Sequence, residues 1–477
     1  MQTNLKKLTD TSFSLSRDSN TPLFTQVCNL LRQKIIDGQL QQNYRLPPSR
    51  SFAIELGVSR TTIVVAYDQL AAEGYIEGRR GSGFFVNSIG KVELNRKQNK
   101  SVPVYSPATI SPKSRKPVHP GFPDLRLFPY RQWARCISRV ARLSPEALVV
   151  ADDLFGDIKL RQSIARYLYD WRGIQTTAGQ ILITAGSIDG LEICVRTLAK
   201  SGQYVGLENP GYLPLRNIVQ NLGMKPLWLN MDDGGVGIPG LKKSQPPPSL
   251  TILTPSHQFP LGGAMSPLRR TDFLQWAELT NSWIIEDDYD SEFRYAGSPI
   301  QALAGFDNTG RTIYVGTFSK IFSVGLRLGF LVLPPALVPK FTRTLQRFGV
   351  KAATVSQRAL ASFIDSGEFY RHIRRVRRVY GERRKFLLNL LQEKLGDVVS
   401  VEDHAAGMLL LARLPAKYND QTIAEAANRK GVLTAALSVH YAKGDIQKGL
   451  LLGFCSFTET EIEANISILE KIIRSKY

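Results

Sequence analysis

"TIYVGTFSK", residues Thr312 to Lys320, is the most informative segment of this chain for its fold. Its first half is a run of β-branched and aromatic residues, which is typical of a buried strand. Its second half changes to hydroxyl side chains and ends in a single lysine. Polar groups at the carboxyl end of a buried strand lie where open α/β sheets bind their ligands. The stretch therefore predicts an α/β domain with a binding site at Lys320.

Three other segments repeat this pattern of an apolar strand that ends in polar or small residues. Residues 182–184 run into Ala185-Gly186-Ser187 and then into a helical pattern. Residues 250–254 lead into "PSHQFPLG", and residues 283–289, "WIIEDDY", end in carboxylates. We expect these strand ends to meet at one edge of a mostly parallel sheet.

Together these strand ends could hold a phosphorylated aldehyde. A small-residue turn at a helix N-terminus, hydroxyl groups and a nearby arginine suit a phosphate. A strand-end carboxylate and Lys320 would address two other ends of the same ligand. Pyridoxal phosphate (PLP) needs this set, because it takes a lysine for a Schiff base and an acid to keep its ring nitrogen protonated.

A smaller unit at residues 21–87 has a different pattern, of three short helices and two strands. Residues 75–86, "YIEGRRGSGFFV", predict two strands around a glycine-rich loop with two arginines, which is a wing. Two helices joined by a glycine-containing turn form a helix-turn-helix. The helix ends are marked by Pro22 and Gly38, by Ser49 and Gly57, and by Ser59 and Gly74.

In such a unit the last helix enters the major groove of DNA. We therefore predict base and phosphate contacts from the start of that helix, and contacts from one arginine of the preceding helix and two arginines of the wing. The alternative is that the arginines are only solvated surface. The predicted residues are Ser59, Arg60, Thr61 and Thr62, together with Arg50, Arg79 and Arg80.

Length, charge and composition agree with a two-domain DNA-binding protein. The chain has 477 residues, more than one hydrophobic core usually serves, and a formal net charge of +20, which favours a polyanionic partner. Residues 88–120 are polar, basic and proline-rich, and predict a flexible linker between residues 21–87 and 121–477. Four scattered cysteines suggest neither a metal site nor disulfides, and no run is apolar enough to cross a membrane. We expect a cytoplasmic protein.

Residues 21–87 resemble the GntR-type winged-helix family, through the stretch "LPPSRSFAIELGVSRTTIVVAYDQLAAEGYIEGRRGSGFFV" at residues 46–86. Residues 120–477 resemble fold-type I aminotransferases, through "ENPGY", "TPSHQFPLG", "IIEDDYDSEFRY" and "GTFSK". The combination resembles the MocR/GabR family of PLP-dependent transcriptional regulators. This resemblance implies an α/β fold: an N-terminal winged helix-turn-helix, and a large PLP-transferase fold-type I domain with a smaller C-terminal α+β subdomain. It also implies a homodimer arranged head-to-tail.

The resemblance assigns roles to individual residues of the large domain. Lys320 matches the lysine that forms the Schiff base with PLP, and Asp287 matches the partner of the pyridine nitrogen. The remaining matches are Tyr289 to the ring hydroxyl, Tyr212 to ring stacking, and Gly186, Ser187, Thr317, Ser319 and Arg327 to the phosphate region.

Three departures from the family patterns bear on activity and on the effector. Aminotransferases have NPTG where this chain has "FPLG", residues 259–262, so another group, His257, Gln258 or Tyr289, must serve the ring hydroxyl. The C-terminal strand that usually carries the carboxylate-binding arginine has none, because no arginine lies between Arg429 and Arg474. Residues 213–216, "LPLR", contain Arg216 but not the arginine that GABA-responsive members use near Pro214. Neither GABA sensing nor efficient transamination is therefore expected.

The densest basic run, residues 371–378, "RHIRRVRR", leaves two interpretations open. Its arginines could pair with acids of the same domain, or they could contact DNA phosphates that flank the operator.

The function predicted from the sequence is a regulator that binds operator DNA and senses a small amine, an amino acid or PLP itself. Two alternatives remain: a working PLP-dependent aminotransferase with an incidental basic unit, and a regulator whose cofactor site is vestigial.

Overall fold

The computed structural model describes residues 15–17, 19, 21–88, 121–148, 153–240, 246–297 and 300–476. The chain divides into two compact units, residues 1–109 and 110–477, and each has its own core. The expected linker at residues 88–120 lies outside the described residues except for its first residue.

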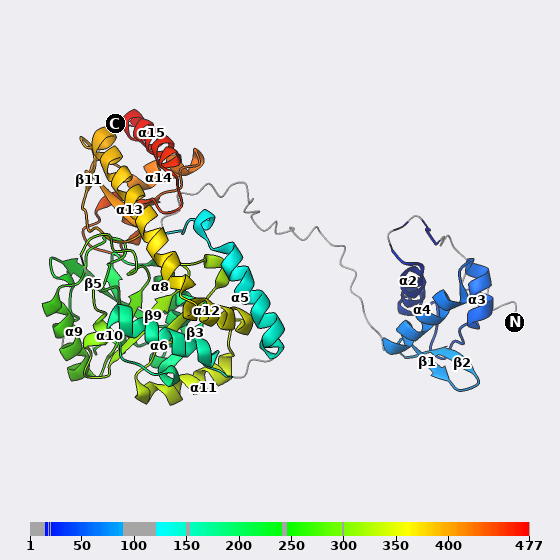
Figure 1. Cartoon of the computed structure of the whole chain (residues 1–477). Coiled ribbons are helices and arrows are strands. Elements are labelled where there is room, and N and C mark those ends of the chain that lie inside the picture. The colour runs from blue at the N-terminus through cyan, green and yellow to red at the C-terminus, as the bar shows by residue number, and fades with distance from the viewer. Residues whose placement is uncertain are drawn as a thin grey trace. The chain divides into compact units, whose positions relative to one another are not determined.

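The N-terminal unit contains the predicted three helices and a two-stranded hairpin (Figure 1). Apolar side chains of all three helices pack together with both strands. Tyr67 is fully buried among them, and its hydroxyl donates to the carbonyl oxygen of Pro47 at 2.9 Å. The elements are α2 (Leu23–Ile36), α3 (Ser49–Leu56), α4 (Arg60–Ala72), β1 (Ile76–Arg79) and β2 (Gly83–Val86).

The ends of these helices follow the local sequence. Ser59 is the N-cap of α4, as predicted, because its hydroxyl accepts from the backbone N–H of Thr62 at 3.1 Å. Gly57 ends α3 with a φ of +63°, a left-handed conformation that favours glycine. The prediction that Ser49 caps α3 is wrong: Pro48 is the N-cap and Ser49 is the first helical residue. Proline suits the start of a helix since it has no N–H to satisfy there.

The second unit is built on an eight-stranded sheet with the order β3-β10-β9-β8-β7-β4-β5-β6. Strands β9, β8, β7, β4 and β5 pair in parallel, whereas β10 is antiparallel to β9 and β3, and β6 to β5. This confirms the predicted mostly parallel α/β sheet. The strands are β3 (Ile181–Thr184), β4 (Tyr204–Asn209), β5 (Lys225–Asp232), β6 (Gly235–Val236), β7 (Leu250–Leu253), β8 (Trp283–Asp288), β9 (Thr312–Thr317) and β10 (Gly329–Val332).

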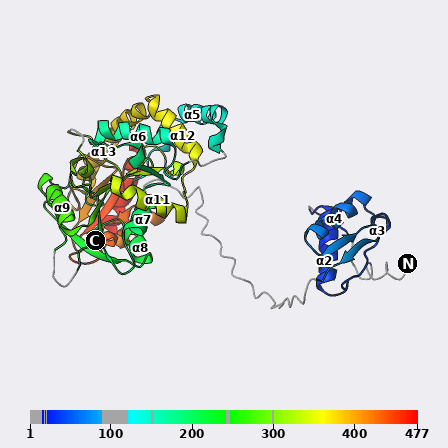
Figure 2. The ribbon, with the colours of Figure 1, turned by 90° about the horizontal axis from the view of Figure 1, so that it is seen from below.

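Helices cover both faces of this sheet (Figure 2). Alternate strand residues face opposite layers, so that Leu182 and Val315 pack in one apolar cluster while Ile183 and Tyr314 pack in the other. The first cluster includes α7 (Ser187–Leu198), α8 (Leu213–Asn221) and α11 (Val338–Phe348). The second includes α6 (Ile158–Arg172) and α12 (Thr354–Asp365), and α5 (Tyr130–Leu143) packs on α12. Two more helices, α9 (Pro267–Thr280) and α10 (Leu303–Phe306), complete the layers.

The long helix α13 (Glu368–Leu395) runs from the large sheet domain to a smaller C-terminal subdomain (Figure 1). That subdomain is a four-stranded antiparallel sheet with the order β11-β12-β14-β13, packed against helices. Its elements are β11 (Ser400–Val401), β12 (Leu409–Leu414), α14 (Asp420–Arg429), β13 (Ala435–Ala436), β14 (Lys448–Gly453) and α15 (Glu459–Lys476).

Candidate functional site

Lys320 lies three residues beyond β9, at the carboxyl edge of the parallel sheet. Its Nζ donates to the carbonyl oxygen of Gly121 at 2.8 Å. Burial lowers the pKa of Lys320, although the charge of Asp290 opposes this. Gly121 has a φ of +85°, and a Cβ there would lie 2.9 Å from Nζ. A lysine whose pKa is lowered is closer to the neutral amine that attacks carbonyl compounds.

The two consecutive carboxylates of β8 have opposite environments. Asp288 is paired with Arg172 at 2.8 Å and accepts a hydrogen bond from Tyr314 at 2.6 Å. Asp287 is also buried, but its Oδ1 accepts no hydrogen bond from any described residue. Burial, together with the charges of Asp288 and Glu208, raises the pKa of Asp287 to about 7. An unpartnered buried carboxyl is costly, so Asp287 is suited to a ligand that brings a cationic N–H donor.

Tyr289, His257 and Gln258 are the groups near "FPLG" that could serve a ring hydroxyl, and they differ in the hydrogen bonds that they already make. The Nδ1 of His257 lies 3.0 Å from both carboxylate oxygens of Asp290 and 3.0 Å from the hydroxyl oxygen of Tyr289. An ionised Asp290 requires the hydrogen on Nδ1, so the hydroxyl hydrogen of Tyr289 can donate elsewhere. Gln258 is already engaged, since its side-chain nitrogen donates to Pro210 O and its oxygen accepts from Leu261 N.

The structure brings the predicted phosphate region together through three neighbouring strands. Gly186 adopts a φ of +98° immediately before α7, whose first residue is Ser187. Gly329 on β10 packs against this turn, and a Cβ there would lie 2.8 Å from the carbonyl carbon of Gly186. On its other side Gly329 pairs with Thr317, the last residue of β9. The turn amides, the Thr317 hydroxyl and a helix N-terminus therefore share one edge.

Arg327 and Ser319 border the same region. Arg327 is exposed and left-handed, with a φ of +50°, two residues before Gly329. The backbone N–H of Ser319 donates to the hydroxyl of Thr317 at 3.2 Å. Asp189 shapes the turn from within α7, because it accepts from Ala185 N and pairs with Lys351 at 2.8 Å.

Tyr212 lies at the N-cap of α8 and is 38% exposed. Its ring meets Phe259 edge-on at 5.7 Å, and Phe259 meets Tyr289 in the same way at 6.0 Å. A small pocket of about 20 Å³ lies here, lined by residues that include Tyr212, Phe259, Asp287, Arg216 and Trp228. Tyr212 and Phe259 would therefore border a flat aromatic ligand placed at this sheet edge.

Glu208, at the end of β4, is a site residue that the sequence prediction missed. It is buried, lines the pocket, and accepts from both the N–H and the hydroxyl of Thr254, at 2.9 and 2.6 Å. Burial raises the pKa of Glu208 to about 7, although these bonds oppose the rise. The signal was available, since "ENPGY" also places an acid at a strand end.

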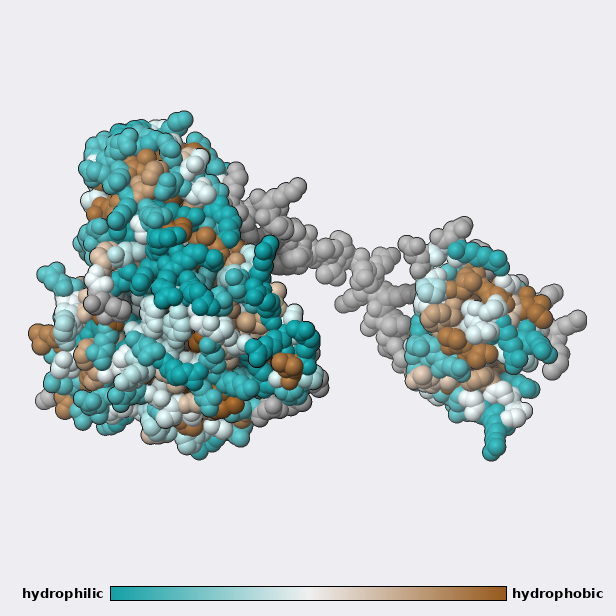
Figure 3. All heavy atoms as spheres, viewed as in Figure 1, coloured by the Kyte–Doolittle hydropathy of each residue, from teal (hydrophilic) through white to brown (hydrophobic). Residues whose placement is uncertain are grey.

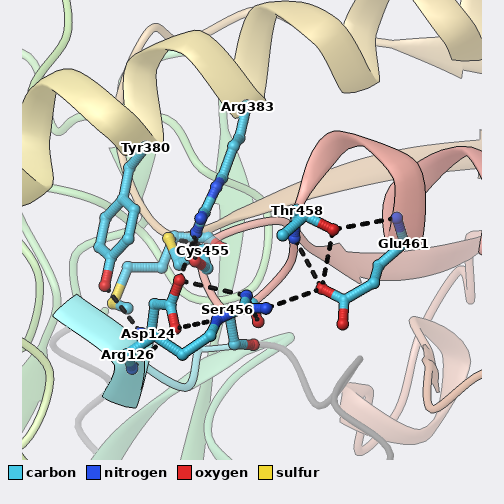
Figure 4. A network of polar contacts seen from close by, with 9 residues as sticks. Asp124, Arg126, Tyr380, Arg383, Cys455, Ser456, Thr458 and Glu461 are labelled. Atoms are coloured by element: carbon cyan, nitrogen blue, oxygen red, sulfur yellow. Dashed lines mark hydrogen bonds and ion pairs between the residues drawn. The ribbon is translucent and has the colours of Figure 1, made fainter.

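A second group missed from the sequence is residues 121–127, where the described part of the second unit begins. The buried Asp124 carboxylate accepts from Arg126 at 2.8 Å and from Arg383 of α13 at 2.9 Å (Figure 4). The backbone N–H of Asp124 donates to the hydroxyl of Tyr380 at 2.8 Å. Arg126 continues the network to the C-terminal subdomain, through Ser456 O and Glu461. This segment is anchored by ion pairs three residues from the carbonyl that accepts from Lys320.

In the N-terminal unit the predicted DNA contacts differ in availability. Arg50, Arg60, Thr61 and Arg80 are exposed. The hydroxyls of Ser59 and Thr62 lie 2.8 Å apart, so both take part in the cap of α4. The Arg79 guanidinium bonds Glu77 at 2.6 Å and Asn43 at 2.8 Å. Ser59, Thr62 and Arg79 could therefore contact DNA only by sharing or breaking the hydrogen bonds that they already make within the unit.

The basic run of α13 has mixed contacts. Arg371 pairs with Glu368 at 2.8 Å, and Arg375 donates to Leu127 O and approaches His372. Arg374 and Arg378 point outward and are exposed. Pairing with an acid of the same domain therefore holds for Arg371, and contact with DNA phosphates stays a prediction for Arg374 and Arg378.

The described residues contain neither a membrane-spanning helix nor a cluster of metal ligands. Within residues 15–476 as described, no helix combines the length and apolar character needed to cross a bilayer. In the same ranges, no three His, Cys, Asp or Glu side chains are placed to hold a metal ion.

Known proteins match both units. Residues 23–86 match the family "Bacterial regulatory proteins, gntR family", and residues 135–463 match "Aminotransferase class I and II", whose members use PLP. The chain is 36% identical over 467 residues to the probable rhizopine catabolism regulatory protein MocR of Rhizobium meliloti, covering 95% of this chain and 94% of that protein. It is 33% identical to the HTH-type pyridoxine biosynthesis transcriptional regulator PdxR of Corynebacterium glutamicum, covering 95% and 96%.

Solved aminotransferases share the fold of the second unit. The kynurenine aminotransferase of Pyrococcus horikoshii, in complex with PMP, superposes with a TM-score of 0.69 at 26% identity, covering 75% of this chain and 90% of that chain. An archaeal alanine:glyoxylate aminotransferase gives a TM-score of 0.70 at 26% identity, covering 76% and 91%.

Proposed function

The chain belongs to the MocR family of HTH-type transcriptional regulators, which join a GntR-type domain to an aminotransferase-like domain, and from that premise we propose that it controls transcription by sensing an amine at a PLP site on Lys320. One observation carries this proposal. Asp287 is a buried carboxyl without a described partner, in the same site as a lysine with a lowered pKa. A regulator that never held a cationic ligand there would gain stability from an apolar residue at position 287.

The residues present fit PLP. Asp287 would bond the pyridine nitrogen, Tyr289 would donate to the ring hydroxyl, and Tyr212 would cover the ring. The Gly186–Ser187 turn, Thr317 and Arg327 would hold the phosphate, with Ser319 beside them. When bound, PLP supplies an aldehyde that reacts reversibly with primary amines, Lys320 among them.

Gly121 offers a route from the site to the DNA-binding unit. As a free ammonium, Lys320 donates to Gly121 O. A Lys320 nitrogen that is covalently engaged has fewer hydrogens, so Gly121 would be deprived of this donor, and an amine effector that releases the lysine would restore it. Because Asp124 anchors the segment three residues later, the change would be directed toward the chain that precedes Gly121. The bias would act as a population shift between DNA-binding states.

The site suits sensing better than turnover. Strand β14 presents Leu450, Leu451 and Leu452 where an aminotransferase would carry an arginine for the substrate carboxylate. A lysine elsewhere in the site would not replace that arginine, because an ammonium group lacks the bidentate geometry of a guanidinium. The effector is therefore an amine or amino acid that binds covalently, and amino-group transfer would be marginal.

On the DNA side, α4 would enter the major groove, with Arg50 and Arg80 at flanking phosphates. Two copies would read two half-sites as a homodimer, which we propose to be arranged head-to-tail. The mass of the protein bound to a two-half-site duplex tests this, because a monomer on DNA would contradict it.

The cofactor assignment is tested by borohydride reduction of the PLP-treated protein followed by peptide mass spectrometry. We expect a phosphopyridoxyl group on the peptide that carries Lys320, and none on that peptide in Lys320→Ala. Lys200→Ala, which removes an exposed lysine just beyond the far end of α7 from the turn, is the matched control and should still be labelled at Lys320. Absence of label in the wild type would refute the site. Sustained amino-group transfer from an amino acid to a keto acid would favour the enzyme alternative.

A further inference from the structure

The recognition helix α4 has apolar side chains on the face that points away from its core. Ile63, Ala66, Tyr67 and Leu70 form the buried face, at i, i+3, i+4 and i+7 spacing. The same spacing, two residues earlier, places Thr61, Val64, Val65 and Asp68 on the opposite face, and all four are exposed. The second face therefore has a methyl-rich centre that the described residues of its own unit leave uncovered.

These valines belong neither to the apolar core of the N-terminal unit nor to the partly buried side chains packed against it. Val64 is 37% and Val65 is 42% exposed, although valine is a weaker helix former than alanine or long polar residues such as lysine and glutamine. Figure 3 shows that hydrophobic atoms reach the surface of this unit. An exposed apolar surface on a helix that otherwise follows helix-turn-helix rules indicates a contact made with a partner.

The surroundings of the valines suit DNA better than a protein surface. Arg60 adjoins them at the start of α4, and Arg50 and Arg80 are exposed on neighbouring elements. The valines lie in the first two turns of α4, the part of a recognition helix that meets base edges. In the major groove, the apolar group that a base presents is the 5-methyl of thymine.

We propose that Val64 and Val65, with the methyl group of Thr61, read thymine 5-methyl groups in the operator. This inference rests on the proposed DNA-binding role of α4 and adds the base that it prefers. Arg60 and the hydroxyl of Thr61 would supply hydrogen bonds to phosphates or base edges, and the valines would supply discrimination by shape.

The test begins with an operator selected by the full-length protein from a library of random duplexes. Each thymine is then replaced by deoxyuridine, which removes the 5-methyl group and keeps every hydrogen-bonding group of the base. At fixed salt, we expect at least one replacement per half-site to weaken wild-type binding, by about fourfold for each thymine methyl group that the valines bury. Val64→Ala or Val65→Ala should remove this sensitivity at the same thymine.

Ile54→Ala is the matched control, because Ile54 is 79% exposed on α3, which in this docking geometry crosses the backbone and reads no base edge. It should keep the sensitivity to deoxyuridine. Circular dichroism checks that each variant is folded. Alanine at these exposed helical positions should leave the helix content unchanged. Binding that ignores every thymine methyl, or a sensitivity that survives in both valine variants, would overturn the inference. A change in oligomeric state without a change in DNA affinity would instead assign the face to a protein partner. Failure to select any operator would count against the proposed function itself.

Discussion

The two units present their functional groups in opposite ways. In the N-terminal unit, Arg60, Thr61 and Arg80 are exposed to solvent. In the second unit, Asp287 and Glu208 are buried, and burial raises the pKa of each to about 7. DNA is a solvated polyanion that a protein can meet at its surface, whereas a small cationic ring is held selectively only where water is excluded. An exposed site is therefore recognised by the position of its residues in a motif, and a buried site by a polar group that has no partner.

The largest effects should separate the two acids of β8. Asp288→Asn breaks the buried pair with Arg172 and should lower the free energy of unfolding by about 3–5 kcal/mol. Asp287→Asn should leave the fold intact and weaken PLP binding by on the order of 10- to 100-fold, through loss of a charged hydrogen bond. Urea unfolding and PLP titration measure the two quantities. Equal effects of both variants on PLP binding would remove the distinction.

In the PLP-free protein, the buried carboxyl of Asp287 should make the free energy of unfolding depend on pH. Because burial raises the pKa of Asp287 from 3.8 to about 7, the folded state holds a proton there that the unfolded state has released. The contribution to stability is present at low pH and disappears as pH rises toward 7. The stability of the wild type relative to Asp287→Asn should fall by on the order of 2 kcal/mol between pH 5 and pH 8. A pH-independent difference would mean that Asp287 has a partner in solution.

In the N-terminal unit, substitutions of Arg60 and of Arg79 should weaken operator binding to different extents. Arg60→Ala should weaken operator binding about tenfold. Arg79→Ala should have a smaller effect, because that guanidinium already bonds Glu77 and Asn43. Binding isotherms at one salt concentration compare them, with Arg80→Ala as the second wing variant. An Arg79 effect as large as that of Arg60 would show that these bonds give way to DNA.

The smallest expected effect tests whether the second unit also presents an exposed DNA surface. Arg374→Gln with Arg378→Gln should flatten the slope of log affinity against log salt by about 2 if both contact phosphates. Arg371→Gln is the control, since Arg371 is paired with Glu368. A slope that stays unchanged in the double variant would leave α13 as a solvated helix.

The sequence carried enough information for every element that depends on local pattern. The three helices of the N-terminal unit, the Ser59 cap and the strands around Lys320 follow from apolar periodicity and turn residues, and the structure confirms them. The order of the strands in the sheet, which brings Gly186, Gly329 and Thr317 close together, could be learned only from the structure.

Contacts between distant segments were beyond local reasoning. Gly121 and Lys320 are 199 residues apart, and Asp124 and Arg383 are 259 apart. No pattern in either stretch encodes such a partner, because the pairing depends on how α13 and the C-terminal subdomain pack. The choice among His257, Gln258 and Tyr289 was open for the same reason, since the bonds of Gln258 to the distant Pro210 and to Leu261 are visible only in the structure.

If the state of Lys320 controls DNA binding, operator affinity should change once this lysine is permanently engaged. PLP-free protein and borohydride-reduced, PLP-loaded protein would be titrated with the same selected operator, with Lys320→Ala treated identically. We expect the two forms to differ in operator affinity by at least about fivefold in the wild type and not at all in Lys320→Ala. Equal operator affinities of the two wild-type forms would contradict it.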